Sequence, residues 1–335
     1  MKYLKSDTYR EDLKTAVEHI VGFETFSDKS VLVLGASGLI GSFLVDCLLY
    51  ANEHFHSQIA IYAASRNIDQ LRERFGRRQA DDLHFIEMDV TEADFDQTFD
   101  YIIHAASYGH PKAFRETPVE VFLSNVIGMQ KVLEMAMHNR RCRVLYVSSG
   151  EVQEQVDHLS ARACYPMGKK AAETLCVSWN QEYGTDVVIA RPCHTFGANM
   201  TRKDNRAASQ FLMSAAGGAN IVMYSAGEQL RSFSYVADCA SGILTVLAKG
   251  ECGAVYGVSS GTCCSVRMFA DQCASAGNCE VKVHLPTDAQ KAEASPIKNQ
   301  IVRNDALKHL GWQPAFSIEE GIRRSIQILR EMDGV

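Results

Sequence analysis

Tyr165 and Lys169 lie four residues apart, a separation that puts both side chains on one face of a helix. A helix beginning at Pro166 is expected, because proline is well tolerated in the first turn. The segment Val144–Ser149 comes before them and predicts a buried strand that ends in hydroxyl residues. A tyrosine hydroxyl is a poor base at neutral pH, but a nearby ammonium group favours the phenolate. The pattern therefore predicts acid–base chemistry at Tyr165, assisted by Lys169, with the Ser149 hydroxyl bonded to the same substrate oxygen.

A second signature lies near the N-terminus, where the apolar run Val31–Leu34 leads into spaced glycines and then an apolar helix. Gly35 would permit a tight turn, and Gly38 would let the backbone approach a diphosphate. Gly41 would let the helix lie close to its strand. The free N–H groups and the dipole of such a helix favour an anionic ligand, so the pattern predicts a dinucleotide site. The same loop would add further cofactor contacts from Ser37, Leu39 and Ile40.

The Gly-x-x-Gly-x-x-Gly spacing is one residue longer at its start than the motif of ordinary dinucleotide dehydrogenases. With the downstream Tyr-x-x-x-Lys, it resembles the extended short-chain dehydrogenase/reductase superfamily. The resemblance implies a Rossmann-type fold, a nicotinamide cofactor and a homodimer. It also implies that Tyr165 removes a proton from a sugar hydroxyl as hydride passes to the cofactor, while Lys169 also binds the nicotinamide ribose.

Strand and helix patterns alternate along the first two thirds of the chain, which predicts an α/β fold with a doubly wound parallel sheet. The strands expected after the first are Ile59–Ala63, Leu83–Glu87, Tyr101–His104, Val144–Ser148 and Val187–Ala190. Thr8 and Glu11 fit a capping box, so a helix is expected before the first strand. We expect an N-terminal helical extension over residues 1–29 and an NAD(P)-binding domain over residues 30–191. A smaller, mainly substrate-binding α/β domain is expected over residues 192–335, with the chain crossing back between the last two.

Glu151, just after the hydroxyl residues, narrows the reaction class by resemblance. Sugar-nucleotide 4-epimerases usually have a small apolar residue there, whereas 4,6-dehydratases and UDP-glucuronate decarboxylases have a glutamate. Dehydratases also place an aspartate just before it, and here that residue is Gly150. Decarboxylase-like chemistry is therefore favoured, with 4-epimerase as the alternative. A solvated charge at the strand end is the purely structural interpretation of Glu151.

Longer stretches resemble UDP-glucuronate decarboxylase and its relatives, namely residues 162–173, 227–238 and 310–314. This resemblance implies that Arg206 and Arg231 contact the diphosphate of a nucleotide sugar, as guanidinium–phosphate geometry favours. The chain also departs from the pattern: Gln153 replaces the usual tyrosine after Glu-Val, and His194 replaces an asparagine. His194 is a candidate substrate contact, although a lone histidine beside a strand is as often structural.

The end of the second strand distinguishes NAD from NADP. NAD-specific members of the superfamily carry an acidic residue there, whereas this chain has Ser65, Arg66 and Asn67. Arg66 and Ser65 could bind the additional phosphate of NADP, yet Ser65 or Asn67 could bind a ribose hydroxyl. Because the internal redox cycle that Glu151 implies keeps NAD bound, NAD is favoured and NADP is the alternative. A simple NADPH-dependent keto-sugar reductase and an inactive dinucleotide sensor are the competing functions. Further cofactor contacts implied by the resemblance are Asp89, Val90, Ala105, Ala106, Ser107, Asn125 and Pro192.

The composition is that of an ordinary globular protein. The 335 residues are 46% hydrophobic and carry a formal net charge of −6, with dispersed Lys and Arg, so a nucleic-acid partner is not expected. No apolar stretch is long enough to span a bilayer, and the charged start lacks the apolar core of a signal peptide, so a cytoplasmic location is expected. The 11 cysteines are scattered without a Cys-x-x-Cys pair, which predicts reduced thiols and no metal site.

Overall fold

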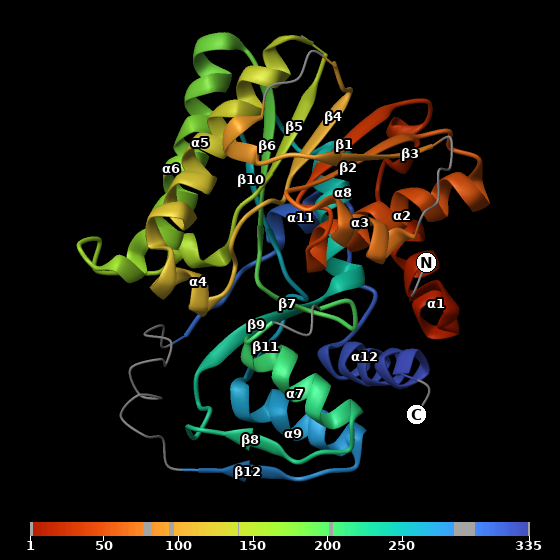
Figure 1. Ribbon diagram of the computed structural model, residues 1–335, viewed down its shortest axis with the longest axis vertical. Helices are drawn as coiled ribbons and strands as arrows, with labels where there is room; N and C mark the ends of the chain where they lie inside the picture. The colour runs from red at the N-terminus through yellow and green to blue at the C-terminus, as the bar shows by residue number, and fades with distance from the viewer. Residues whose placement is uncertain are drawn as a thin grey trace.

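The computed structural model describes residues 3–76, 82–93, 97–139, 141–200, 204–284 and 299–333. A seven-stranded parallel sheet forms its larger part, and a smaller group of strands and helices lies below it in Figure 1. The strands of the large sheet are Ser30–Leu34 (β1), Ala60–Ser65 (β2), Leu83–Glu87 (β3), Tyr101–His104 (β4), Arg143–Val147 (β5), Asp186–Pro192 (β6) and Val255–Val258 (β10). Their order is β10-β6-β5-β4-β1-β2-β3. The α/β class with a doubly wound parallel sheet is confirmed, and β10 is a strand that the sequence did not predict.

Helices cover both faces of this sheet, which explains why its strands are apolar without alternation. Val31 and Val33 of β1 pack on the face that carries α2 and α8, whereas Leu32 and Leu34 pack on the face that carries α5 and α6. The helices around the large sheet are Leu39–Phe55 (α2), Ile68–Phe75 (α3), Pro111–Glu116 (α4), Pro118–Met137 (α5), Cys164–Tyr183 (α6) and Val236–Lys249 (α8).

The strand order reverses between β1 and β4, because β2 and β3 extend the sheet on one side and β5, β6 and β10 extend it on the other. At such a switch point, the loops after the two strands diverge and leave a crevice at the carboxyl edge of the sheet. The glycine-rich turn after β1 and residues 105–107 after β4 both lie at this edge. The topology therefore places the predicted cofactor loops together.

The smaller part holds a three-stranded sheet of order β11-β9-β7 and a separate parallel pair, β12 and β8. Its elements are His194–Phe196 (β7), Ala207–Ala216 (α7), Ile221–Met223 (β8), Leu230–Tyr235 (β9), Cys263–Ser265 (β11), Val266–Gly277 (α9), Val281–Val283 (β12) and Ile318–Asp333 (α12). The short helix Asp305–His309 (α11) packs against β10 and α8 of the larger part (Figure 1). Between β9 and β11 the chain returns to the large sheet to form α8 and β10 (Figure 1). The division at residue 191 stays a prediction, and this return of the chain agrees with the expected crossing.

A helix precedes β1, but its start differs from the one expected. This helix, α1, spans Asp7–Glu18, and Ser6 is its N-cap: Ser6 has an extended backbone, and its Oγ accepts the N–H of Tyr9 at 3.0 Å. Thr8 lies inside the helix, where its hydroxyl donates to Glu331 at 3.0 Å. The capping box at Thr8 and Glu11 is therefore wrong, because a serine two residues earlier takes the capping position.

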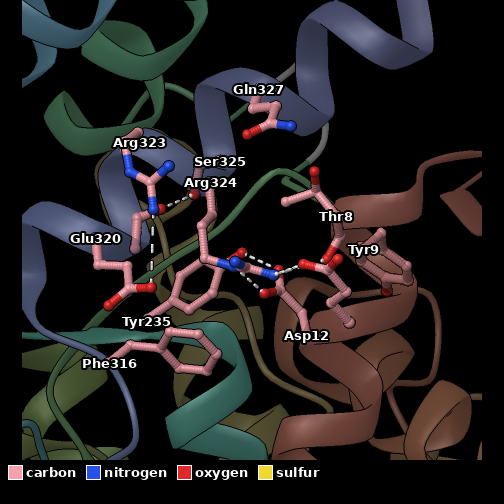
Figure 2. A network of polar contacts seen from close by, with 12 residues as sticks. Thr8, Tyr9, Asp12, Tyr235, Phe316, Glu320, Arg323, Arg324, Ser325 and Gln327 are labelled. Atoms are coloured by element: carbon pink, nitrogen blue, oxygen red, sulfur yellow. Dashed lines mark hydrogen bonds and ion pairs between the residues drawn. The ribbon is translucent and has the colours of Figure 1, made fainter.

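α1 joins the two parts of the molecule through a buried carboxylate. Asp12 accepts hydrogen bonds from the Tyr235 hydroxyl at the end of β9 and from Arg324 of α12, at 2.5 Å for the latter (Figure 2). Arg324 also donates to the Thr8 carbonyl at 3.1 Å. On its other side α1 contacts α2, where Tyr9 donates to Asp46 at 2.5 Å. The N-terminal extension is thus an integral part of the fold.

Short 3₁₀ helices complete the chain at Tyr3–Lys5 (η1), Phe23–Phe26 (η2), Val90–Glu92 (η3), Gly150–Gln153 (η4) and Ala161–Ala163 (η5). A search of the described residues finds no helix with the length and apolar character needed to cross a membrane.

Candidate active site

The glycine-rich turn has the geometry that its sequence predicted. Gly35 has φ +83°, and a Cβ there would lie 2.7 Å from the backbone of Ala105 and Ala106. A Cβ on Gly41 would lie 2.2 Å from the Gly35 carbonyl oxygen, so the first turn of α2 passes directly over this loop. Gly38 is the N-cap of α2 and offers no side-chain oxygen to its first turn. The first N–H groups of α2 therefore have no side-chain partner at the N-cap. Such groups can bind an anionic ligand at the glycine-rich turn.

A cavity of about 1040 Å³ opens beside this turn. The predicted cofactor residues that line it are Gly35, Ser37, Gly38, Ser65, Arg66, Asp89, Val90, Ala105, Ala106 and Ser107. Its size and its place at the carboxyl ends of β1 to β4 fit a dinucleotide at the topological switch point. The predicted cofactor residues outside this lining are Leu39, Ile40, Gly41, Asn125, Tyr165, Lys169 and Pro192; the first three belong to the first turn of α2.

The end of the cavity next to β2 carries polar groups from both of its walls. The hydroxyls of Ser37 and Ser65 lie 3.0 Å apart, which joins the glycine turn to the end of β2. Arg66 reaches across to α5, where its Nη1 lies 3.1 Å from Glu120, and its guanidinium lies 4.5 Å from the centre of the Tyr108 ring. Tyr108 and Glu120 line the same cavity.

Asn125 acts through its neighbours. It is buried, its Oδ1 accepts the Ser107 hydroxyl at 3.0 Å and the Tyr146 hydroxyl at 3.3 Å, and its amide donates to the Val121 carbonyl at 2.7 Å. These bonds hold Ser107 at the cavity wall. The cofactor contact expected of Asn125 stays a prediction.

Tyr165 and Lys169 both lie in the first two turns of α6, and both are buried. Lys169 donates to the Val147 carbonyl at 2.7 Å, and burial lowers its pKa to about 7. Its Nζ lies 5.9 Å from the centre of the Tyr165 ring. Burial raises the pKa of Tyr165 to about 12, and the Glu151 charge adds to this shift, whereas the Ser149 hydrogen bond and Arg206 oppose it. The tyrosine is therefore neutral at neutral pH in this arrangement.

Glu151 is paired. Its carboxylate accepts a hydrogen bond from Arg162 at 2.8 Å, and its side chain is only 17% exposed, so its interpretation as a solvated charge is wrong. The Arg162 guanidinium lies 4.7 Å from the centre of the Phe114 ring, which stacks on Tyr165 with ring centres 4.8 Å apart. Ser149 caps the 3₁₀ turn by accepting the Glu151 N–H at 3.1 Å. The catalytic candidates thus share one connected cluster.

Arg162 and Phe114 were not among the residues expected at the site. Arg162 precedes Tyr165 by three residues, a spacing that could have drawn attention to it. Nothing in the local pattern marks Phe114, which reaches Tyr165 from α4.

The three residues expected to contact substrate also come together around this cluster. His194 is half-buried, its Nε2 is shielded from solvent, and its pKa is lowered to about 3 by desolvation and by the charges of Arg231 and Arg206. Arg231 is buried and faces the charges of Glu154 and Glu151, while burial lowers its own pKa. Arg206 precedes α7, where Asp204 pairs with it at 2.6 Å.

Glu154 was also missed by the sequence reasoning. Burial and the Glu151 charge raise the pKa of this carboxyl, and Arg231 opposes that shift. Pro192, the last residue of β6, lies behind this cluster, its carbonyl oxygen 3.6 Å from where a Gly150 Cβ would be. Among the described residues, no group of three or more His, Cys, Asp or Glu side chains could hold a metal ion.

A family model described as "NAD dependent epimerase/dehydratase family" matches residues 31–259, which include the glycine turn and the Tyr165–Lys169 pair. The chain belongs to this family. It is therefore an NAD-dependent enzyme, which confirms the expected nicotinamide cofactor. The cradle around Gly35 and the adjoining cavity fit that cofactor.

Relatives of this NAD-dependent enzyme cover nearly all of the chain. UDP-glucuronic acid decarboxylase 1 of Xenopus tropicalis is 27% identical over 321 residues, which are 90% of this chain and 72% of the relative. UDP-glucuronic acid decarboxylase 6 of Arabidopsis thaliana is 28% identical, over 88% of this chain and 87% of the relative.

Solved structures confirm the fold. The Bordetella bronchiseptica enzyme WbmF, in complex with NAD⁺ and UDP, superposes with a TM-score of 0.75 at 22% identity, over 93% of this chain and 98% of that one. DesIV, a dTDP-glucose 4,6-dehydratase from Streptomyces venezuelae, gives a TM-score of 0.77 at 22% identity, over 91% and 98%.

Proposed function

We propose that the enzyme decarboxylates a nucleoside-diphosphate uronate after oxidising the C4 hydroxyl of its sugar. The observation that carries this proposal is the partly buried Glu151–Arg162 pair beside Tyr165, because a held carboxylate lies next to the base that would act at C4. Relatives named UDP-glucuronic acid decarboxylase match nearly all of the chain and support the same reaction.

Each residue of the cluster has a distinct task in this reaction. Tyr165 removes the C4 hydroxyl proton, Ser149 holds the same oxygen, and the Lys169 ammonium favours the phenolate. Bound NAD supplies the hydride acceptor. The C4 ketone makes the C6 carboxylate that of a β-keto acid, so the C5–C6 bond breaks with release of carbon dioxide and leaves an enolate. In this proposal Glu151 assists the return of a proton to C5, and hydride returns to C4 as Tyr165 gives back its proton.

Gly150 favours decarboxylation over dehydration. A Cβ at this position would lie 2.5 Å from Cγ2 of Val302 and 3.8 Å from the side chain of Gln300. The space that the dehydratase aspartate would need is therefore filled by another segment of the chain. Epimerisation at C4 is the second candidate. The hydrogen bond from Arg162 to Glu151 supports it, because a carboxylate engaged by an arginine can serve to anchor its own loop and take no part in the chemistry.

Arg231 and Arg206 fit the nucleotide diphosphate of the proposed substrate. The charges of both guanidinium groups lower the pKa of His194, and the charge of Arg206 also lowers the pKa of Tyr165. The two cations therefore lie around the proposed sugar site. Guanidinium groups bind phosphate oxygens well because their donors form a planar fork.

The expected homodimer is also part of the proposal. Exposed apolar side chains lie on the neighbouring helices α5 and α6, at Phe122, Val177 and Tyr183. A second copy that covered them would remove this surface from water, as symmetric dimers commonly do. The cytoplasmic location stays a prediction.

Glu151→Gln tests the proposed function. We expect the variant to reduce its bound NAD when UDP-glucuronate is added, because Tyr165 and Lys169 carry that half-reaction, but to stall before the later steps. The absorbance of reduced nicotinamide would then persist. Glu134→Gln on the exposed face of α5 is the matched control and should turn over normally. A Glu151→Gln variant that completes the cycle at close to the wild-type rate would contradict the assigned role of this carboxylate.

A further inference from the structure

Arg66 follows β2 directly, the place where dinucleotide enzymes bind the adenosine ribose. A guanidinium at this place would be expected to bind the 2′-phosphate of NADP. In this structure it is engaged from the opposite wall of the cavity. Its Nη1 lies 3.1 Å from the Glu120 carboxylate of α5, and it stacks over Tyr108, whose hydroxyl also donates to Glu120.

The charge balance of the cavity points the same way. Among the described residues that line it, Arg66 is the one cationic side chain, whereas the carboxylates are Asp89, Glu92, Glu116 and Glu120. A 2′-phosphate adds about two negative charges near neutral pH. The two hydroxyls of the NAD ribose add no charge. The surplus of carboxylates therefore disfavours the binding of NADP and leaves the binding of NAD unaffected.

We propose that Glu120 makes the enzyme select NAD over NADP by offsetting the charge of Arg66. It would do from α5 what an acidic residue at the end of β2 does in NAD-specific enzymes. The Arg66 and Glu120 side chains are about half exposed, so their ion pair adds little to stability. The selectivity comes instead from charge repulsion: the 2′-phosphate of NADP would have to approach the Glu120 carboxylate, whereas NAD has no phosphate there. This assignment does not depend on which sugar the enzyme processes.

Glu120→Gln tests the assignment, because it removes the charge and keeps the shape of the side chain. Purified protein would be equilibrated with equal concentrations of NAD and NADP, and the retained cofactor would be measured by mass spectrometry. We expect the NADP-to-NAD ratio to rise about tenfold or more, as expected for removing one like charge near a bound phosphate. Glu134→Gln, on the same helix but outside the cavity, should leave the ratio unchanged.

A double variant, Glu120→Gln with Arg66→Ala, identifies the group that receives the phosphate. The gain in NADP binding should disappear, while NAD binding should stay close to that of the wild type. An unchanged cofactor ratio in folded Glu120→Gln would overturn the proposal. So would an equal rise in the Glu134→Gln control, or a gain in NADP binding that survives the loss of Arg66.

Discussion

His104 should make the enzyme sensitive to acid, and His104→Gln should reduce that sensitivity. His104 ends β4, is fully buried, and neither of its ring nitrogens has a hydrogen-bond partner among the described residues. Burial, with a smaller effect of the Lys169 charge, lowers its pKa from 6.5 to about 3. The folded protein therefore keeps this ring neutral, whereas the unfolded chain takes up a proton below pH 6.5.

The size of the effect follows from the difference in pKa. Because the folded-state pKa is lowered, the stability from His104 is present above pH 6.5 and is lost as pH falls towards 3. A pH of 4.5 is about two units below the histidine pKa of the unfolded chain. At about 1.36 kcal/mol per unit, His104 should lower the free energy of unfolding at this pH by about 2.7 kcal/mol. Any folded-state pKa below about 4 gives nearly the same figure at this pH.

Urea unfolding of the wild type and of His104→Gln at pH 8 and pH 4.5 would measure this loss. Glutamine cannot titrate, so the free energy of unfolding should fall by about 2.7 kcal/mol less in the variant than in the wild type. His194, whose pKa is also lowered, is present in both proteins, so its contribution to the pH dependence cancels. His138→Gln, on the exposed end of α5, is the control and should keep the wild-type pH dependence. Equal losses in the wild type and His104→Gln would refute the explanation.

Three further changes test other parts of the structure. Tyr165→Phe should fold normally and lose turnover by about a hundredfold or more, since the proton acceptor is gone; steady-state kinetics would show this, and a tenth of the wild-type rate would argue against the role. Gly41→Ala should lower the NAD content of the purified protein, because its Cβ would lie 2.2 Å from the Gly35 oxygen, whereas Gly109→Ala, with open space around it, should retain NAD. Burial raises the pKa of Asp12 to about 6, so its contribution to stability is lost as pH rises from about 4 through 6. Asp12→Asn should therefore lack that loss in denaturation measurements across this range, and an identical pH profile would contradict it.

The parts of the fold that the sequence predicted are those set by local pattern. Apolar runs such as Val31–Leu34 marked the strands of the large sheet, because a parallel sheet covered on both faces needs them. The start of α1 was predicted wrongly, since both Ser6 and Thr8 are good capping residues and only the backbone conformation distinguishes them. β10 was missed because it is short and joins the sheet from far along the chain.

The residues of the candidate site also fall into those predicted from local sequence and those that depend on tertiary packing. The glycine turn and the Tyr165–Lys169 pair lie within short segments, so their spacing together with the expected strand before each of them predicted both. The Arg162–Glu151 pair and the Phe114 stack depend on how separate segments pack, and no periodicity records such contacts. The same holds for Glu120, which reaches Arg66 from a helix more than fifty residues away in sequence.

The most direct test of the proposed reaction is the mass of the sugar nucleotide recovered after purified enzyme is incubated with UDP-glucuronate. We expect a product that has lost carbon dioxide, formed without net consumption of NAD and absent with Tyr165→Phe. A product of unchanged mass with inverted configuration at C4 would contradict decarboxylation and identify a 4-epimerase instead.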